Sequence, residues 1–440
     1  MAHIAMYFGS KSILVSCVIL VISSRAASQR LLENPTKDSN ARTRYTKIFG
    51  ASAIRRLIEN NGYGYENYTV TTEDGYILNL NRIVNPIVKN GNRGYPLLLL
   101  NGYLMHSEAW LIQERADTNI AAVWAGLGYD VWLGDQRGTM RSRRHVNLTT
   151  DDKKYWDFSF HESGLYDTSA FIDFILQKTG YNDLIFSCMS LGCSFHAVLI
   201  SERPAYNEKI RAAIYFVPLV NNIRKVSEMT SLMQLWFKAQ FSTVDVLEKS
   251  GIEDLFPNFG KIRKELYYLC RPTPYMSLLV ARIMYGKAIH VSEGSACFMT
   301  SLASGGSNIK STKHVLQVYD TGEFAKYDYG REENKRRYGT ELPPLYDISK
   351  ITSFVAIYYS DSDVFASVEG VEKTMKSLSG PTYGCKLPNF NHIDVAIGTT
   401  FQHVFPDVIE VLNALSGYKN NTEKLRSGKC PSMEWIRRLN

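Results

Sequence analysis

The stretch LIFSCMSLGCSFHAVL, residues 184–199, decides the fold that the rest of the chain has to complete. It begins with the apolar run Leu184–Phe186, which predicts a strand buried on both faces of a sheet. A sharp turn centred on Ser190 is expected next, with a helix leaving from it. Such a strand, turn and helix lift a serine hydroxyl clear of the strand edge. Ser190 is therefore the candidate nucleophile.

Strand-like runs and helical stretches alternate on both sides of this segment. Residues 68–82 predict a hairpin, because Asp74-Gly75 supplies the positive φ values of a tight turn. The alternation that follows predicts an α/β fold, in which helices cover both faces of a mainly parallel sheet. The expected strands are residues 95–100, 129–133 and 354–359, and the expected helices are residues 120–125, 165–178, 368–378 and 404–415.

The alternation stops in the middle of the chain. From about residue 220 to residue 341 there is little strand signal, and apolar residues such as Leu278, Leu279 and Ile283 recur at helical spacing. We therefore expect a helical insertion that interrupts the α/β core. The predicted organisation is a signal peptide at residues 1–27, a first core part at 28–217, a helical cap at 218–341, a second core part at 342–415 and a polar tail at 416–440.

The N-terminal segment predicts export from the cytoplasm. Lys11 precedes a short apolar run at residues 13–22, and the small residues Ala26 and Ala27 follow it. A run of this length suits a cleaved signal peptide better than a membrane span, and no later stretch is apolar enough to cross a bilayer. We expect a secreted or lysosomal protein. Three Asn-X-Thr triplets make Asn67, Asn147 and Asn420 candidate glycosylation sites.

Cysteine usage is compatible with an oxidising compartment. Cys17 belongs to the signal segment, so six of the seven cysteines remain. An oxidising compartment permits disulfides, and the working pairs are Cys270–Cys297 and Cys385–Cys430. No CxxC pair or Cys/His cluster indicates a metal site, and we expect no cofactor.

Composition and charge exclude some classes of partner. The chain is 45% hydrophobic and 21% charged, as globular proteins are, and its formal net charge is +7. The basic clusters at residues 141–144 and 335–337 are short and lack interleaved aromatic residues. We therefore expect no nucleic-acid partner. The oligomeric state does not follow from these features.

A nucleophilic serine needs an imidazole to accept its proton and an acid to orient that imidazole. His392 lies in a loop just before the last expected helix, and Asp363 lies just past the expected strand at residues 354–359. Loops at the carboxyl ends of strands collect ligand chemistry in open α/β sheets. Asp363 is the preferred acid, while Asp361 and Asp394 remain alternatives. Seven further histidines, at 106, 145, 161, 196, 290, 314 and 403, are expected to be structural.

Backbone N–H groups are the expected donors to an oxyanion at this site. One belongs to Leu191, directly after the nucleophile, and its helix N-terminus adds partial positive charge. The second is expected in the loop after the first buried strand, Asn101–Leu104, at Tyr103. Because backbone groups donate, side-chain identity at these positions is only loosely constrained.

Several segments resemble those of the acid lipase family, and the likeness runs from about residue 61 to about residue 415. The resemblance implies an α/β-hydrolase core with a helical cap, a triad on Ser190, Asp363 and His392, and cleavage of acylglycerols or sterol esters at a lipid interface. The similar segments are Thr72–Leu78, Gly128–Gly134, Arg137-Gly138, Trp156–Glu162, His314–Gln317, Tyr327–Gly330, Pro343–Tyr346 and Asn391–Asp394.

Three motifs depart from that family pattern. Asn101-Gly102 stands where His-Gly is usual, Cys188-Met-Ser-Leu-Gly192 where Gly-His-Ser-Gln-Gly is usual, and Ser360–Phe365 lacks the usual glycine and tryptophan-leucine pair. No departure removes a member of the triad. The altered elbow nevertheless motivates an alternative function, a secreted lipid-binding or carrier protein that has lost turnover. Labelling by a fluorophosphonate, which reacts readily only with an activated serine, separates the two functions.

Overall fold

The computed structural model describes residues 53–86, 94–113, 118–220, 231–255, 266–285, 290–302, 305–394, 398 and 404–416 of the 440-residue chain. Within these ranges a single sheet has the strand order β1-β2-β4-β3-β6-β7-β8-β9, and β5 pairs with β2. The strands are β1 (Gly64–Thr71), β2 (Tyr76–Val84), β3 (Pro96–Leu100), β4 (Asp130–Asp135), β5 (Arg144–His145), β6 (Leu184–Met189), β7 (Ile210–Phe216), β8 (Phe354–Ser360) and β9 (Thr382–Leu387).

The sheet is parallel from β4 to β9 and antiparallel at its β1–β2 end. Every residue of β3, β4, β6 and β8 is buried, as expected for strands covered on both faces. The predicted hairpin is present as β1 and β2, and Gly75 in its turn has φ 93°. The α/β fold class predicted from the sequence is confirmed.

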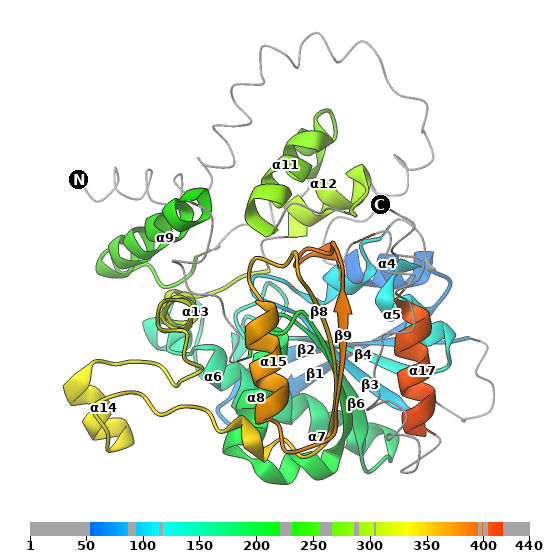
Figure 1. Cartoon of the computed structure of the whole chain (residues 1–440), viewed down its shortest axis with the longest axis horizontal. Coiled ribbons are helices and arrows are strands. Elements are labelled where there is room, and N and C mark those ends of the chain that lie inside the picture. Colours follow the sequence, from blue (N-terminus) through cyan, green and yellow to red (C-terminus); the bar gives the residue numbers. More distant parts are fainter. Residues whose placement is uncertain are drawn as a thin grey trace.

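Helices cover both faces of the sheet (Figure 1). On one face α4 (Ala53–Asn60), α5 (Ile120–Gly126) and α17 (Phe405–Ser416) contribute to one buried apolar cluster. On the other face α6 (Phe160–Glu162), α7 (Thr168–Thr179), α8 (Leu191–Glu202) and α15 (Val368–Ser377) contribute to a second cluster. No helix in the described ranges is both long and apolar enough to span a bilayer.

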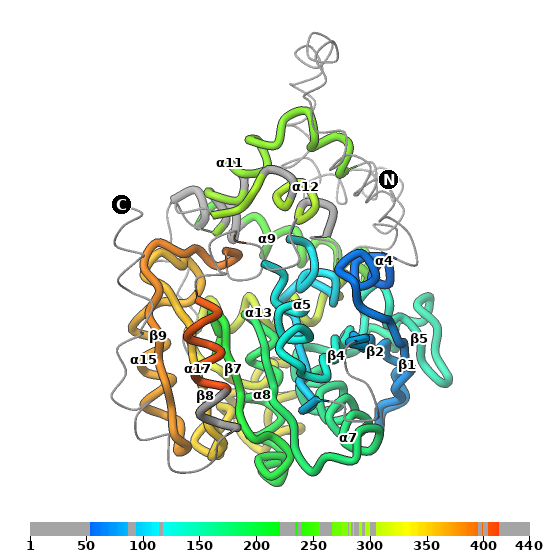
Figure 2. The backbone as a smooth tube through the Cα atoms, turned by 90° about the vertical axis from the view of Figure 1, so that its right-hand side faces the viewer, coloured from blue at the N-terminus to red at the C-terminus, as the bar shows by residue number. Residues whose placement is uncertain are grey.

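A helical insertion separates β7 from β8, although these two strands pair side by side in the sheet. Its helices α9, α11 and α12 lie beyond the carboxyl ends of the strands (Figures 1 and 2). A disulfide between Cys270 and Cys297 joins the residues before α11 to α12. The helices of the insertion are α9 (Ser231–Lys249), α11 (Pro274–Tyr285), α12 (Glu293–Leu302), α13 (Ile309–Thr321) and α14 (Arg331–Tyr338).

The second half of the insertion is bonded directly to the core. The Asn308 side chain donates hydrogen bonds of 2.6 Å to the carbonyl oxygens of both Trp156 and Phe158. The ring of His314 on α13 contacts Ser159 Oγ at 3.0 Å. These buried polar contacts hold α13 against the segment of residues 156–159, which leads into α6.

A buried arginine ties three core elements together. Arg137, just after β4, bonds Asp167 at the start of α7 and Asp74 in the β1–β2 turn, at 2.7 and 2.5 Å. Its backbone N–H also donates to Asp167 at 2.9 Å, and its guanidinium lies 4.0 Å from the centre of the Tyr76 ring. Asp167 has no exposed surface, so its charge depends on this partner.

We predict that Arg137→Leu lowers the free energy of unfolding by about 3–5 kcal/mol, because it leaves a buried carboxylate without a counter-ion. Urea unfolding monitored by circular dichroism measures the change. Arg336→Ala is the matched control, since Arg336 pairs with Glu333 on the exposed helix α14 and should change stability little. Equal effects of the two substitutions would contradict the role assigned to Arg137.

Candidate active site

Ser190 occupies a strained turn between β6 and α8. Its backbone angles are φ 55° and ψ −124°, a region that residues other than glycine rarely adopt. The Ser190 N–H donates to the carbonyl of Phe216, the last residue of β7, at 2.9 Å. The N–H of Leu219 donates in turn to the Ser190 carbonyl at 3.2 Å. The turn is therefore held from the neighbouring strand, with the Ser190 side chain at the carboxyl edge of the sheet.

Two glycines allow the loop after β3 to lie against this turn. A Cβ atom on Gly192 would come within 2.7 Å of the Asn101 carbonyl oxygen. A Cβ atom on Gly102 would come within 2.9 Å of Ser190 Cβ. Real Cβ atoms do not approach so closely, so larger residues would push the loop and the turn apart. The Asn101-Gly102 pair thus places the loop beside Ser190.

The structure brings Ser190, His392 and Asp363 into contact. Ser190 Oγ lies 2.7 Å from His392 Nε2, and His392 Nδ1 lies 2.8 Å from Asp363 Oδ2. With its proton on Nδ1, a neutral imidazole donates to Asp363 and accepts the hydrogen bond of the Ser190 hydroxyl. All three residues are at most 5% exposed, so bulk water is largely excluded from the contacts. The arrangement can move a proton from the hydroxyl to the imidazole.

The two alternative acids lie in different positions. Asp363 Oδ1 accepts backbone N–H bonds from Phe365 and Ala366 at 2.7 and 3.0 Å, which fixes the carboxylate under His392. Asp361 is exposed and accepts from the Asn389 backbone at 3.2 Å. Asp394 is buried and accepts from the backbone of Asn391 at 2.8 Å. Only Asp363, among the three, has a described hydrogen bond to the His392 ring.

The loop that carries Tyr103 is bonded to the insertion. The Tyr103 hydroxyl and Thr312 Oγ1 on α13 are 2.5 Å apart. The Gly305 N–H donates to the Leu104 carbonyl at 2.8 Å, and Leu104 has φ 60°. A Cβ atom on Gly305 would meet the Met105 carbonyl carbon at 2.6 Å. The Leu191 N–H begins α8 and so has no partner within its own helix.

The remaining described histidines have partners outside this site. His196 contacts the Tyr215 hydroxyl, and burial lowers the pKa of His196 to about 3. Burial likewise lowers the pKa of His314 to about 3. The ring of His145 hydrogen-bonds with the Asp74 carbonyl, and the ring of His161 with the Tyr346 hydroxyl. The ring of His290 hydrogen-bonds with the Asn389 carbonyl. His106 is buried, and His403 lies outside the described residues. Within the described ranges, no three His, Cys, Asp or Glu side chains gather as metal ligands.

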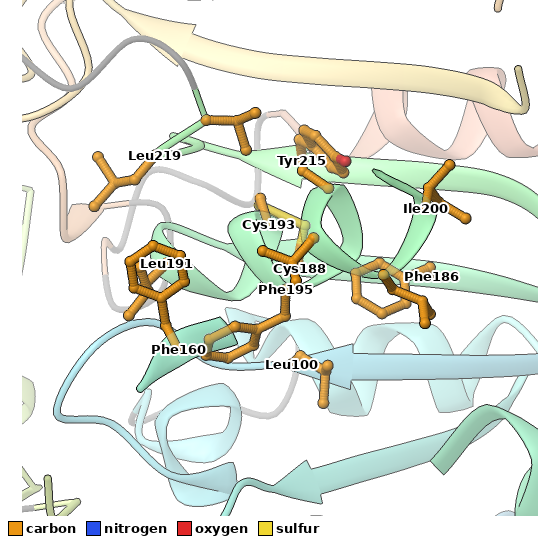
Figure 3. Close-up of a cluster of buried hydrophobic side chains, with 14 of the residues drawn as sticks. Leu100, Phe160, Phe186, Cys188, Leu191, Cys193, Phe195, Ile200, Tyr215 and Leu219 are labelled. Atoms are coloured by element: carbon orange, nitrogen blue, oxygen red, sulfur yellow. A yellow bond between two sulfur atoms is a disulfide. The ribbon is translucent and has the colours of Figure 1, made fainter. Parts of the chain in front are cut away.

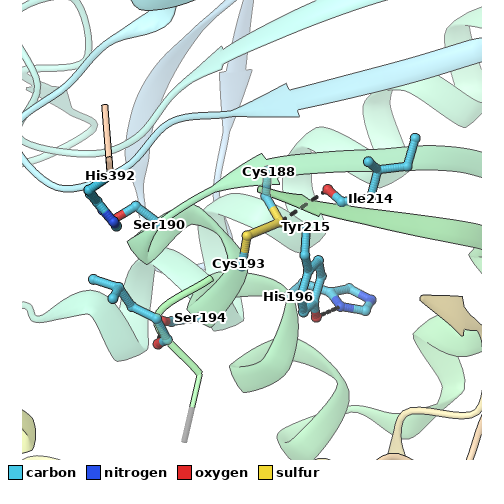
Figure 4. Close-up of a disulfide and its surroundings, with 9 residues drawn as sticks. Cys188, Ser190, Cys193, Ser194, His196, Ile214, Tyr215 and His392 are labelled. Carbon is cyan, nitrogen blue, oxygen red and sulfur yellow. Dashed lines mark hydrogen bonds between the residues drawn. A yellow bond between two sulfur atoms is a disulfide. The ribbon is translucent and has the colours of Figure 1, made fainter. Parts of the chain in front are cut away.

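The structure contains a disulfide that the sequence patterns did not indicate. Cys188 and Cys193 are joined across the turn that carries Ser190 (Figure 4). Their Cα atoms are 5.1 Å apart. In the sequence, the only indication of this pair is that one cysteine lies on each side of the expected turn. The distance between them, which decides whether they can bond, is known only from the structure. Cys430 lies outside the described residues, so the pair Cys385–Cys430 stays a prediction.

The candidate glycosylation sites and the signal segment are only partly described. Asn67 on β1 and Asn147 after β5 are both exposed. Asn420 and residues 1–27 lie outside the described ranges. Glycosylation and signal cleavage therefore remain predictions.

Comparisons with known proteins identify the family. Residues 54–114 match the partial α/β-hydrolase lipase region, and residues 95–246 match the α/β hydrolase fold. Lipase 1 of Drosophila melanogaster is 32% identical over 82% of this chain and 80% of its own length. Lipase member N of Mus musculus is 32% identical over 81% of this chain and 89% of its own length. Gastric triacylglycerol lipase of Homo sapiens is 27% identical over 82% and 90% of the two chains. The chain belongs to the acid lipase family, a family of ester hydrolases with the α/β-hydrolase fold.

Asp394 connects the His392 loop to the insertion and should make stability depend on pH. Its Oδ1 accepts the backbone N–H of His290 at 2.8 Å. Burial raises the pKa of the Asp394 carboxyl to about 6, whereas an unfolded Asp titrates near a pKa of about 3.9. Between those values the folded state holds a proton that the unfolded state has lost. The stabilising contribution of this group is therefore present below pH about 4 and is lost as pH rises to about 6.

We predict that Asp394→Asn reduces the fall in the free energy of unfolding between pH 4 and pH 6, because Asp394 no longer titrates while Asp167, whose pKa burial also raises to about 6, still does. Urea unfolding at several pH values measures the slope, which is read independently of any constant change in stability. Asp361→Asn removes an exposed carboxylate and should keep the wild-type slope. A wild-type slope in Asp394→Asn would show that another group causes the pH dependence.

Proposed function

We propose that the protein is a serine ester hydrolase that cleaves neutral lipid esters, acylglycerols or sterol esters, through a covalent acyl-enzyme. The observation that carries the proposal is the continuous hydrogen-bonded path from Ser190 Oγ through His392 to Asp363. A hydroxyl, an imidazole and a carboxylate in this order are the parts that acyl transfer needs. Membership of the acid lipase family supports the same reaction.

The reaction follows from the positions of these groups. Ser190 Oγ attacks the ester carbonyl carbon while its proton passes to His392 Nε2. Asp363 accepts the hydrogen bond from Nδ1–H of His392 and stabilises the imidazolium that forms. The backbone N–H groups of Leu191 and Tyr103 donate hydrogen bonds to the carbonyl oxygen and stabilise its negative charge. His392 then gives its proton to the departing alcohol, and a water molecule, activated by the same imidazole, releases the fatty acid.

Apolar side chains on the insertion support a lipid substrate. Large hydrophobic residues of α9, of α11 and of the segment before α11 are exposed, although such residues are usually buried. These helices lie beyond the carboxyl ends of the strands (Figure 1), and Ser190 directly follows β6 at that edge of the sheet. A lipid surface would cover these side chains. They are Leu235, Val246, Tyr268, Leu269, Tyr275 and Leu279.

Export to the extracellular space or the lysosome is part of the proposal. The disulfides Cys188–Cys193 and Cys270–Cys297 are typical of proteins that fold in an oxidising compartment. Asn67 and Asn147 are exposed, as glycan attachment requires.

Ser190→Ala should abolish hydrolysis of a short-chain soluble ester and labelling by a fluorophosphonate, with kcat falling by about 10⁴-fold or more because no nucleophile remains. Ester hydrolysis and mass-spectrometric detection of the labelled peptide measure the effect. Ser201→Ala is the control, since Ser201 lies at the far end of α8 and accepts a hydrogen bond from the Asp347 backbone. Folded wild-type protein that takes no label and cleaves no ester would overturn the proposal and favour a lipid carrier.

Asp363→Asn should lower kcat by roughly 10³- to 10⁴-fold, because an amide no longer holds the required tautomer of His392. Asp361→Asn changes an exposed carboxylate two residues away and should lower kcat by less than about tenfold. Steady-state kinetics on the same ester compare the two variants. A larger loss in Asp361→Asn would assign the acid to the other carboxylate.

A further inference from the structure

The disulfide Cys188–Cys193 joins the two arms of the turn that carries Ser190. Cys188 is the last residue but one of β6, and Cys193 is the third residue of α8. The separation of their Cα atoms, 5.1 Å, lies in the range that disulfides need. Figure 4 shows the bond on the same turn as Ser190, whose hydroxyl points toward His392. A covalent bond therefore joins the residues on either side of the candidate nucleophile.

The backbone of this turn is strained, so its conformation depends on restraints from the surrounding structure. A non-glycine residue at φ 55° and ψ −124° keeps that conformation only where its surroundings enforce it. The hydrogen bond from Ser190 N–H to Phe216 fixes the turn to β7, and Ser194 Oγ on α8 donates to the Leu219 carbonyl. The disulfide adds a covalent link between β6 and the first turn of α8, which further restricts the direction in which α8 leaves the turn.

The two sulfur atoms also lie where strand and helix are closely packed. Neither cysteine has exposed surface, and both belong to the apolar cluster that includes Phe186, Phe195 and Tyr215 (Figure 3). The bond is therefore enclosed in the apolar core between β6 and α8.

We propose that the Cys188–Cys193 disulfide is a positioning element for the nucleophile. It holds α8 against β6, so that Ser190 Oγ stays within reach of His392 Nε2 and the Leu191 N–H stays directed at the reacting carbonyl oxygen. The inference rests on the proposed function, because a positioning role requires a reactive serine. It assigns to Cys188 and Cys193 a part in the reaction although neither touches the substrate.

The bond itself is tested by differential alkylation. Trypsin releases residues 179–209 as one peptide that contains Cys188 and Cys193 and no other cysteine, because proline follows the only arginine inside it. Denatured wild-type protein should carry no alkyl group on this peptide before reduction and two after reduction. Full alkylation without prior reduction would overturn the proposal.

The positioning role is tested by comparing two double variants. Cys188→Ala/Cys193→Ala removes the elbow bond, and Cys270→Ala/Cys297→Ala removes the bond in the insertion. Fluorophosphonate labelling and kcat of the first variant should fall by roughly 10- to 100-fold while KM changes by less than about threefold, because only the alignment of Ser190 is lost. The second variant should label at nearly the wild-type rate. Both are measured well below their unfolding temperatures.

The outcomes separate this inference from the proposed function. If the wild type labels and the elbow variant labels equally fast, the positioning role is wrong and the hydrolase proposal stands. If the wild type carries the bond but takes no label, both proposals fail. Should the elbow variant not fold, Cys188→Gly/Cys193→Ala, which places at position 188 the glycine usual in the family, gives the comparison. An unchanged labelling rate in this folded variant would overturn the inference.

Discussion

The strained backbone turn at Ser190 is the constraint on which the rest of the site depends. It lifts the hydroxyl toward His392, and it does so only because several elements enforce it. The Ser190 N–H bonds the end of β7, and the loop after β3 approaches so closely that glycine is required at positions 102 and 192. The parallel sheet thus brings the carboxyl ends of β3, β6 and β7 together around Ser190.

The insertion and the core form the site together. Gly305 bonds the Leu104 carbonyl, and Tyr103 contacts Thr312, so the loop expected to supply an oxyanion donor is fixed from the insertion side. On the other side of Ser190, Asp394 accepts a hydrogen bond from the backbone of His290. Both the donor loop and the histidine loop therefore keep their positions through contacts with residues of the insertion.

Much of this arrangement was accessible from the sequence. Long apolar runs predicted β3, β6 and β8, and the residues placed at the ends of β6 and β8 included Ser190 and Asp363. The patterns did not indicate β7 or β9. Arg211 and two alanines weaken the apolar run of β7, while Gly384 and Lys386 interrupt β9, which pairs only with β8 in the described sheet. Likewise, no periodicity reveals a disulfide, because a bond depends on a distance across the turn.

The wide sequence separation of the three contacting side chains has a consequence for biosynthesis. His392 follows Ser190 by 202 residues. A nascent chain that has just completed the elbow therefore lacks both the proton acceptor and the carboxylate, whatever structure its first strands have formed. On the ribosome, the serine hydroxyl remains an ordinary alcohol until the last strands of the sheet have been translated and paired.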